Sequence, residues 1–403
     1  MQNKRYTTDK IKLKKGEYQR GNNAFAYWWI DNHGKRKFVY AKSLPELRQK
    51  EENILRDTLD GINYSKLDST VNSYFELWKD IKSGIRNTTF VSYVRYYKRY
   101  VEPEFGKQKL KNITYSKVVG FLKTLAVEKG LAFGTIRNIK VVLSMVFDIA
   151  VRDDVMRKNP CRGSLRELQR EYENTAKEVR ALTLDEQRRF ESFLERPGHY
   201  HQYYAVFTTM LWTGMRVGEV LGLRWEDIDF ENNEIDVNHI LINYDKGKGE
   251  GNVFTVNPPK TKCSIRTVPM LPKVKEALLE EKEKQEQLGI HCLSEIDSYT
   301  NFIFLNSKGK VLDHKKLNNR LSQICKKINE SNPTAPEFPH VHNHMLRHTF
   351  ATRMREAGAD IKATSEMMGN EGILITLKTY TDASREFKSR EIAVLQNYYE
   401  NAK

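Results

Sequence analysis

The stretch TGMRVGEVLGLRWEDID, residues 213–229, shows most directly how the C-terminal half of the chain folds. An arginine that follows a glycine and precedes apolar residues at helical spacing predicts a helix beginning near Arg216, with a polar corner after it. An arginine at a helix N-terminus is well placed to hold an anion such as a phosphate. A surface ion pair between Arg216 and Glu219 explains the same spacing equally well. We interpret Glu219 as a residue that orients the arginine rather than as a reacting group.

The next segment, residues 235–269, predicts a β-hairpin. A β-branched run over 235–242 is followed by a glycine-rich turn at 246–251 and by the sequence PPKTKCSIRTVP over 258–269. We expect Lys260 at the tip of this hairpin, where a lysine beside a phosphodiester could protonate a departing oxygen if nearby arginines lowered its pKa. Solvated lysines are the commoner reason for such a composition, so this segment alone does not decide the role of Lys260.

Four histidines surround the start of another predicted helix, in the sequence HVHNHMLRH at 340–348. Helical spacing places His344 and Arg347 on one face, and Gly358 marks the end of the helix. A metal site is the competing interpretation. However, the pair of His344 and His348 lacks the glutamate of the zinc protease pattern, and no acidic cluster accompanies the His-Asn-His string. We therefore expect no metal here.

The composition of the whole chain indicates the class of its partner. With 403 residues, a formal net charge of +15 and 39% hydrophobic residues, the chain is long enough for two or three domains and basic enough to bind a polyanion. Nucleic acid is the favoured partner, with an ordinary basic enzyme as the alternative. No apolar run approaches a membrane span of ~20 residues, no signal peptide is apparent, and the four cysteines form no C-x-x-C pair. We expect a cytoplasmic protein with reduced thiols and no membrane contact.

The last informative segment is MMGNEGILITLKTYT, residues 367–381, which contains Asn370 and Tyr380. Any single tyrosine among the 20 in the chain is most often structural. The combination carries more weight, because metal-free transesterification of DNA requires a nucleophile, cations for the phosphate and a proton donor. The groups that meet this requirement are, in chain order, Arg216, Lys260, His344, Arg347, Asn370 and Tyr380.

Before residue 181 the pattern predicts two further modules. In the helical module, apolar stripes are formed by Val71, Tyr74, Phe75 and Trp78, and by Ile136, Ile139, Leu143, Val146, Phe147 and Ala150. Between them Arg95, Lys98 and Arg99 stand among tyrosines, which suits contacts with a DNA backbone, although the tyrosines could equally be core. The N-terminal module is a β-hairpin, with strands at 27–30 and 37–41, followed by a helix.

The second strand of the hairpin also carries basic residues. Those that we expect to contact DNA, if a sheet face enters a groove, are Lys35, Arg36 and Lys37. Solvated lysines are an equally good interpretation. We expect domain boundaries at 1–64 and 65–165, a linker at 166–180, and a last domain at 181–403.

These motifs together resemble the tyrosine recombinases, the family of phage and conjugative-transposon integrases. Its box of Thr-Gly-x-Arg-x-x-Glu, its lysine-threonine hairpin, its His-x-x-Arg-His and its terminal tyrosine are matched by Arg216, Lys260, His344, Arg347 and Tyr380. The resemblance implies a multidomain α+β chain. We expect a small N-terminal β-sheet plus helix module for arm-type DNA sites, an all-helical core-binding domain, and a mainly helical catalytic domain with a small β-sheet and a C-terminal tail helix.

The resemblance also implies an activity, that of a site-specific DNA recombinase of a mobile element. Such an enzyme integrates and excises DNA through a 3′-phosphotyrosyl intermediate on Tyr380, without a cofactor. Arg216 and Arg347 would neutralise the phosphate, Lys260 would protonate the leaving 5′ oxygen, and His344 would receive the proton of the tyrosine. The partners implied are double-stranded DNA, three further copies in a synaptic tetramer, and an accessory directionality factor.

One position departs from the family pattern. The family usually has histidine or tryptophan where this chain has Asn370, which can donate a hydrogen bond to a phosphate oxygen but cannot carry a proton charge. We predict activity that is reduced, not abolished, relative to an Asn370→His variant. Two alternatives remain open: a DNA-binding regulatory or architectural protein with a decayed site, and a type IB-like topoisomerase.

Overall fold

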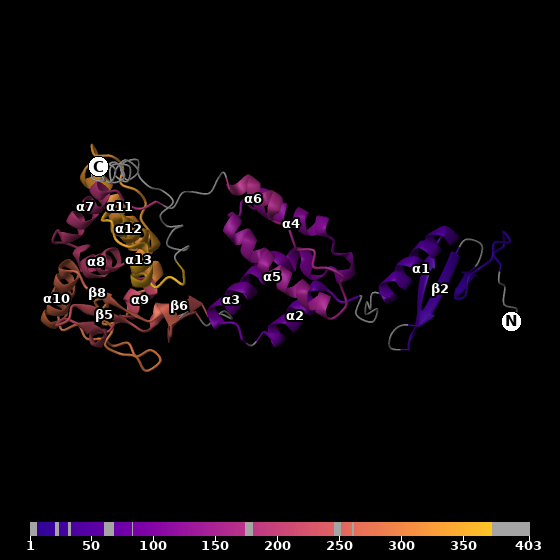
Figure 1. The fold of residues 1–403 in the computed structure, drawn as a ribbon, viewed down its shortest axis with the longest axis horizontal. Helices are drawn as coiled ribbons and strands as arrows, with labels where there is room; N and C mark the ends of the chain where they lie inside the picture. Colours follow the sequence, from indigo (N-terminus) through magenta and orange to yellow (C-terminus); the bar gives the residue numbers. More distant parts are fainter. Residues whose placement is uncertain are drawn as a thin grey trace, which may run out of the picture. The chain divides into compact units, whose positions relative to one another are not determined.

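The computed structural model describes residues 6–20, 24–30, 34–59, 68–82, 84–173, 180–245, 251–259 and 262–372 (Figure 1). The chain divides into two units, Met1–Ala176 and Lys177–Lys403. The first unit contains two separate apolar cores, and the second contains one large core with a small satellite cluster. The predicted combination of a small sheet module, a helical module and a mainly helical C-terminal module is confirmed. Within the described ranges, every helix is too short or too polar to cross a lipid bilayer.

The N-terminal module is a three-stranded antiparallel sheet with one helix. Its elements are β1 (Glu17–Arg20), β2 (Ala24–Ile30), β3 (Arg36–Ala41) and α1 (Leu44–Leu59), with strand order β1-β2-β3. Because side chains alternate along a strand, Tyr27 and Trp29 pack with Leu47 of α1, whereas Trp28 lies on the opposite face. The predicted hairpin and helix are confirmed. β1 was not predicted, because its sequence EYQR has no apolar alternation.

The described elements of the second module are all helices. Its elements are α2 (Val71–Ile81), α3 (Asn87–Tyr96), the π-helical η2 (Tyr97–Gly106), the short η3 (Leu110–Asn112), α4 (Tyr115–Val127), α5 (Phe133–Arg152) and α6 (Arg166–Glu173). Both predicted apolar stripes are buried, on α2 and α5. Tyr97 belongs to this core: its ring stacks on Phe75 with 3.5 Å between centroids, and its hydroxyl donates to Asn72 Oδ1 over 2.7 Å.

The segment that we predicted as a linker, 166–180, is helical in its first half. Residues Arg166–Glu173 form α6, and the side chain of Leu168 is buried in the core of the helical module. The polar composition suggested a linker, but tertiary packing can hold a short helix that its sequence alone would not form. A buried leucine in a charged segment is a weak signal in a sequence. Residues 174–179 lie outside the described ranges.

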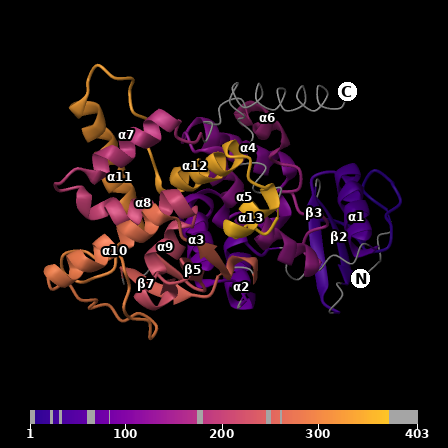
Figure 2. The ribbon, with the colours of Figure 1, turned by 60° about the vertical axis from the view of Figure 1, so that its left-hand side comes forward.

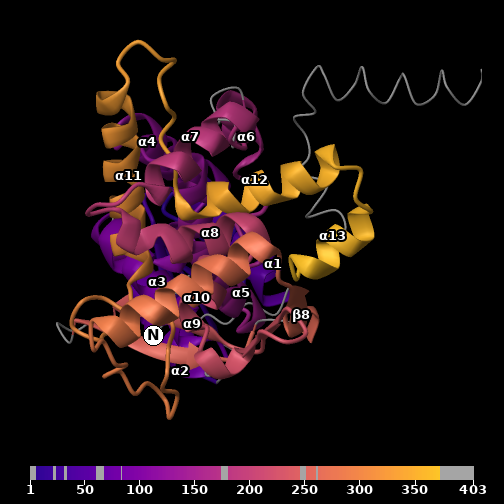
Figure 3. The same cartoon turned by 90° about the vertical axis from the view of Figure 1, so that its left-hand side faces the viewer.

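The third module is mainly helical. Its helices are α7 (Leu184–Glu195), η4 (His201–Tyr203), α8 (Tyr204–Thr213), α9 (Val217–Gly222), η5 (Trp225–Asp227), η6 (Lys262–Ser264), α10 (Pro272–Gln287), α11 (His314–Ser331), α12 (Asn343–Glu356) and α13 (Ile361–Met367). Buried almost all round, α8 lies between α10 and α12 in both side views (Figures 2 and 3). It ends at Gly214 in a left-handed conformation, where a Cβ atom would collide with the ring of Phe350 on α12. Only glycine allows this close approach.

The strands of the third module form two small antiparallel sheets. They are β4 (Ile228–Asp229), β5 (Glu234–Val237) and β8 (Arg266–Pro269) in one sheet, and β6 (Ile240–Asp245) and β7 (Asn252–Asn257) in the other. The single strand that we predicted over 235–242 is therefore two strands, which are separated at Asn238 and His239. The glycine-rich turn joins β6 to β7, and Lys260 comes after β7 in the chain, not in that turn. The apolar run hid the break because both halves are equally rich in β-branched residues.

Candidate functional site

Three of the six predicted catalytic residues converge on one point of the third module. The Nη2 atom of Arg347 donates to Asn370 Oδ1 over 2.7 Å, and Nη2 of Arg216 approaches the same oxygen at 3.3 Å. Arg216 also donates to the carbonyl oxygen of Gly369 over 2.8 Å, and Arg347 Nη1 donates to that of Gly214 over 2.7 Å. The ends of α8 and α13 thus hold two guanidinium groups around one carboxamide, although the residues are up to 154 positions apart.

The carboxylate of Glu219 binds both the backbone and the guanidinium of Arg216. One carboxylate oxygen accepts from the Arg216 backbone N–H and the other from Arg216 Nη1, both over 2.8 Å. The Glu219 side chain is 1% exposed and that of Arg216 40% exposed, so the ion pair is not the surface pair that we considered. Burial alone would raise the pKa of Glu219, but the guanidinium groups of Arg266 and Arg216 bring it below its ordinary value. Glu219 is therefore an anion that orients Arg216.

Arg347 carries a positive charge in a buried position. Burial, reinforced by the like charge of Arg216, lowers its pKa to about 9, which still leaves it charged at neutral pH. Its hydrogen-bond partners within the described residues are the neutral oxygens of Gly214 and Asn370. A guanidinium whose partners are neutral can still attract an anion strongly, because the low surrounding dielectric strengthens the interaction.

His344 lies on α12 one turn before Arg347, as the helical spacing predicts. Its side chain is accessible to solvent, and its ring meets that of His348 edge to face with 4.7 Å between centroids. Partial burial of the ring and then the charge of Arg347 lower the pKa of His344, so that the neutral form dominates at pH 7. A neutral imidazole can accept a proton. Within the described ranges no group of three or more metal-ligating side chains is close enough to hold a metal ion.

Two predicted catalytic residues, Lys260 and Tyr380, lie outside the described residues. The structure describes the chain on either side of the lysine, where β7 ends at Asn257 and β8 begins at Arg266. It also describes the turn after α13 that contains Asn370. The roles of Lys260 and Tyr380 stay predictions.

The basic residues predicted at DNA in the N-terminal module do not share one face. Arg36 pairs with Ile30 across the sheet and stacks on Trp28 at 4.4 Å, on the face away from α1. Lys37 pairs with Trp29, whose side chain packs toward α1. Lys35 precedes β3. We predicted these residues as a group because they are adjacent in the sequence, but the strand register places Arg36 and Lys37 on opposite faces of the sheet.

In the helical module, Arg95, Lys98 and Arg99 are exposed around the junction of α3 and η2. The guanidinium of Arg99 lies over the ring of Tyr100 at 5.3 Å. These residues form a basic strip on the surface, while neighbouring Tyr97 is core. Exposed basic side chains in this arrangement can contact the phosphates of a polyanion.

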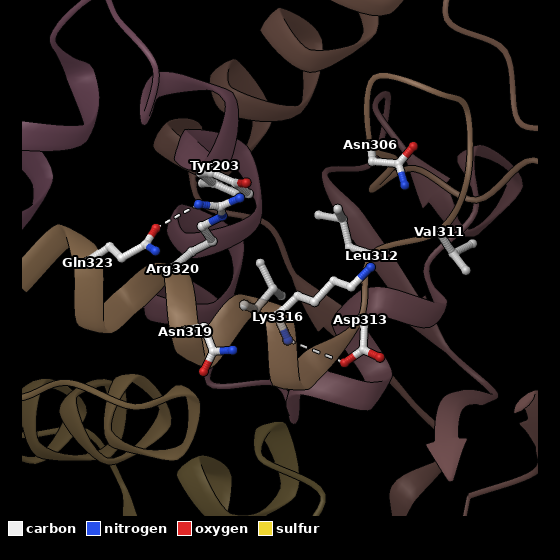
Figure 4. A pocket seen from close by; sticks show the side chains of 10 residues that line it. Tyr203, Asn306, Val311, Leu312, Asp313, Lys316, Asn319, Arg320 and Gln323 are labelled. Carbon is white, nitrogen blue, oxygen red and sulfur yellow. Dashed lines mark hydrogen bonds between the residues drawn. The ribbon is translucent and has the colours of Figure 1, made fainter. Parts of the chain in front are cut away.

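A hollow of about 470 Å³, lined by both polar and apolar side chains, lies along α11 and was not predicted from the sequence (Figure 4). Its floor is one face of α11, with Lys316, Asn319, Arg320 and Gln323. These residues follow one another at helical spacing, which is the signal that the sequence offered. The N-terminus of α11 contacts that of α12, because Asn343 Nδ2 donates to the carbonyl oxygen of His314 over 3.0 Å. The helix that lines the hollow is therefore a neighbour of α12, the helix that carries His344 and Arg347.

A second overlooked residue is Arg266, at the start of β8. Its side chain is 8% exposed and donates to Glu219 over 3.0 Å. The surrounding sequence, SIRTVP, offers little sign of this role, because an arginine in a short strand is usually solvated.

Comparison with known proteins agrees with this arrangement. Residues 180–386 match the model of the phage integrase family, residues 1–58 that of the DNA binding domain of Tn916 integrase, and residues 70–126 that of the N-terminal SAM-like domain of phage integrases. The chain is 29% identical over 388 residues to the transposase from transposon Tn916 of Enterococcus faecalis, covering 92% of each. It is 28% identical over 382 residues to a tyrosine recombinase XerC-like protein of Caldanaerobacter subterraneus subsp. tengcongensis, covering 92% of this chain and 94% of that protein.

Solved structures of integrases are also similar to this chain. The Tn1549 transposon integrase in complex with transposon right end DNA is 27% identical, with a TM-score of 0.70, covering 81% of this chain and 99% of that one. A lambda integrase dimer bound to a core site is 18% identical, with a TM-score of 0.53 and coverage of 93% and 96%, and shares the fold.

Proposed function

The chain belongs to the phage integrase family and is a tyrosine-type site-specific recombinase of a mobile element, and we propose that Tyr380 and the cluster around Asn370 carry out its reaction. The observation that supports the proposal most strongly is the convergence of Arg216 and Arg347 on one oxygen beside a neutral histidine. Two cations at one point suit a phosphodiester, which gains negative charge on its non-bridging oxygens as it is attacked.

The chemistry follows from these groups. The phenol oxygen of Tyr380 forms a bond to phosphorus while the bond from phosphorus to the 5′ oxygen breaks. His344 takes up the phenol proton, and Lys260 protonates the leaving 5′ oxygen. The product is a 3′-phosphotyrosyl bond and a free 5′ hydroxyl. Attack by a 5′ hydroxyl of another duplex reverses the step without an external energy source.

Arg216, Arg347 and Asn370 hold the phosphate. The solvent-exposed part of Arg216 faces the ligand, while buried Glu219 fixes its orientation. Asn370 Oδ1 accepts from the arginines, so its Nδ2 group is the donor that completes the phosphate site.

DNA outside the catalytic site contacts basic surfaces of all three modules. We assign this role in the N-terminal module to Arg36, on the face of the sheet away from α1, and in the helical module to Arg95, Lys98 and Arg99. In the third module the polar face of α11 joins them, because Arg, Asn and Gln side chains can read base edges.

Exchange between two duplexes requires four strand cuts. Each copy of the chain supplies one tyrosine at this position, so the recombining complex is a homotetramer. The predicted tail helix that would join the copies lies outside the described residues. An accessory factor that biases integration or excision completes the assembly, which works on bacterial DNA in the cytoplasm at the nucleoid.

The test is a Tyr380→Phe variant with a nicked duplex that spans the ends of the mobile element encoding the chain. The nick traps the covalent complex because the short cleaved strand diffuses away. We expect DNA affinity within about twofold of wild type and no protein-linked strand on a denaturing gel, because the phenol oxygen is absent. Tyr115→Phe, the same change at an exposed tyrosine of the helical module, should form the adduct normally. An undiminished adduct in Tyr380→Phe would overturn the assignment of Tyr380.

A further inference from the structure

Arg266 lies beneath the proposed phosphate site without touching the place where a phosphate would bind. It is the first residue of β8, directly after the lysine segment, and its side chain is 8% exposed. A buried arginine is costly to maintain unless its donors are satisfied. Its partners therefore indicate what it does.

The donors of Arg266 reach three different parts of the chain. Nη2 donates to Glu219 Oε2 over 3.0 Å, and Nη1 approaches Glu219 Oε1 at 3.4 Å. Nε donates to the carbonyl oxygen of Met367, the last residue of α13, over 2.5 Å. Nη1 also donates to the carbonyl oxygen of Ser264 over 3.1 Å, which fixes the side chain to its own loop.

The turn after α13 is shaped around this guanidinium. Gly369 has a φ of +62°, and a Cβ atom there would lie 2.7 Å from Arg266 Nη1. Glycine is therefore needed both for the left-handed backbone and for the close approach of Arg266. The same residue presents its carbonyl oxygen to Arg216, and Asn370 follows it.

We propose that Arg266 is a positioning residue that sets the distance between Arg216, the segment after Lys260 and the turn that carries Asn370. This inference rests on the proposed function. Arg266 and Arg216 each contact both carboxylate oxygens of Glu219, so two guanidinium groups and one buried carboxylate form a connected cluster that supports the site. Through Met367 the same group fixes the end of α13, and thereby the turn whose oxygens hold Arg216 and Arg347.

The charge of Arg266 has a second consequence. Glu219 stays ionised although it is buried, and the larger contribution comes from Arg266, followed by Arg216. Without Arg266 the pKa of Glu219 rises. On acidification Glu219 is then protonated sooner and loses the ability to orient Arg216. The acid limb of the cleavage profile should therefore move to higher pH.

Arg266→Met removes both the positive charge and the planar set of N–H donors. Arg266→Lys keeps the charge but cannot donate to three partners that lie in one plane. The matched control is Arg224→Lys, since the guanidinium of Arg224 also donates to a buried carboxylate, that of Asp227, within the same module. For each variant the thermal midpoint, the DNA affinity and the adduct rate at saturating nicked duplex are measured from pH 5.5 to 8.5.

We expect the Arg266 variants to bind DNA within about twofold of wild type but to form the adduct more slowly, by roughly 10²-fold for Arg266→Met. Arg266→Lys should keep the acid limb of the pH profile where it is in wild type, because the charge is kept, but its adduct rate should stay below that of wild type. Arg224→Lys should change neither the acid limb nor the rate. If Arg266→Met does not fold, Arg266→Lys decides. A wild-type rate in Arg266→Lys, a slower rate in either variant that merely follows the unfolded fraction, or an unchanged acid limb in folded Arg266→Met would overturn the inference. Failure of the wild-type chain to form any adduct would instead overturn the proposed function.

Discussion

Asn370 accepts hydrogen bonds from two arginines through a single oxygen. This leaves the amide nitrogen as the only group of the side chain that can donate to a phosphate, and an amide cannot gain a proton as negative charge develops. A neutral imidazole at the same position could donate to the phosphate with one nitrogen and accept from Arg347 with the other, and it becomes cationic when the accepting nitrogen takes up a proton in place of that hydrogen bond. The substitution therefore probes how much the site gains from a titratable donor.

We expect Asn370→His to form the covalent adduct faster than wild type by about tenfold, below the full 10²-fold to 10⁴-fold of a general acid because Lys260 already protonates the leaving group. The measurement is the single-turnover rate with saturating nicked duplex. Asn370→Gln, which keeps the amide but moves it by one methylene, is the control and should be slower than wild type. Cleavage by Asn370→His that is equal to wild type or slower would show that the asparagine is not a weakened version of the family residue.

At the scale of single residues, the order of motifs pointed to Arg216, Arg347 and Asn370, and the structure brings these three side chains together. Lys260 and Tyr380 lie outside the described residues, so their place in the site stays a prediction. Arg266 could not be found in this way. In the sequence SIRTVP the apolar Ile265 is 58% exposed and the charged Arg266 is buried. Hydropathy predicts the reverse, because it measures transfer from water and contains no information about the buried carboxylate of Glu219 on α9.

Among the elements, β3 allows a prediction that depends on strand register alone. Arg36 and Lys37 are adjacent and equally basic in charge, yet the pleat sends Arg36 to the open face beside Trp28 and Lys37 toward α1. A sheet that binds DNA through its open face should use only one of them.

We expect Arg36→Ala to weaken binding of the full chain to duplex carrying the element ends by about tenfold, which corresponds to ~1.4 kcal/mol. Lys37→Ala should stay within about twofold. Both affinities are measured by titration at one salt concentration, with the thermal midpoint as a check of folding. Equal losses in the two variants would mean that this sheet does not meet DNA face-on.

Elements with a long apolar period, such as α2, α5 and α12, were predictable because burial of one face dominates their free energy. Short elements were not. β1 has four polar residues, and the division between β5 and β6 is made by Asn238 and His239, where the His239 ring bonds the carbonyl oxygen of Gly222 at the end of α9. Such breaks depend on contacts with distant residues. The π-helical turn η2, which contains Pro103, has no sequence signature of this kind.

For the whole molecule, the three modules were predictable from changes of pattern, because each has its own apolar core. Charge is divided among them as well. Residues 1–64 contain 14 Lys and Arg and 8 Asp and Glu, a net charge of +6 out of the +15 of the chain. The N-terminal module therefore accounts for a large part of the attraction to DNA but contains none of the six residues proposed for catalysis.

Deletion of residues 1–64 should thus separate binding of distant sites from chemistry. We expect the shortened chain to form the covalent adduct on the nicked duplex and to relax supercoiled plasmid, because the site around Asn370 is complete without this module.

Joining of two element-bearing plasmids should fall by more than about tenfold. The slope of log affinity against log salt should become shallower by roughly 1 for each DNA phosphate that the deleted module would have neutralised. If the full chain relaxes plasmids but never joins two DNA partners, its chemistry is that of a topoisomerase; if the shortened chain recombines as well as the full one, the N-terminal module has no part in selecting partners.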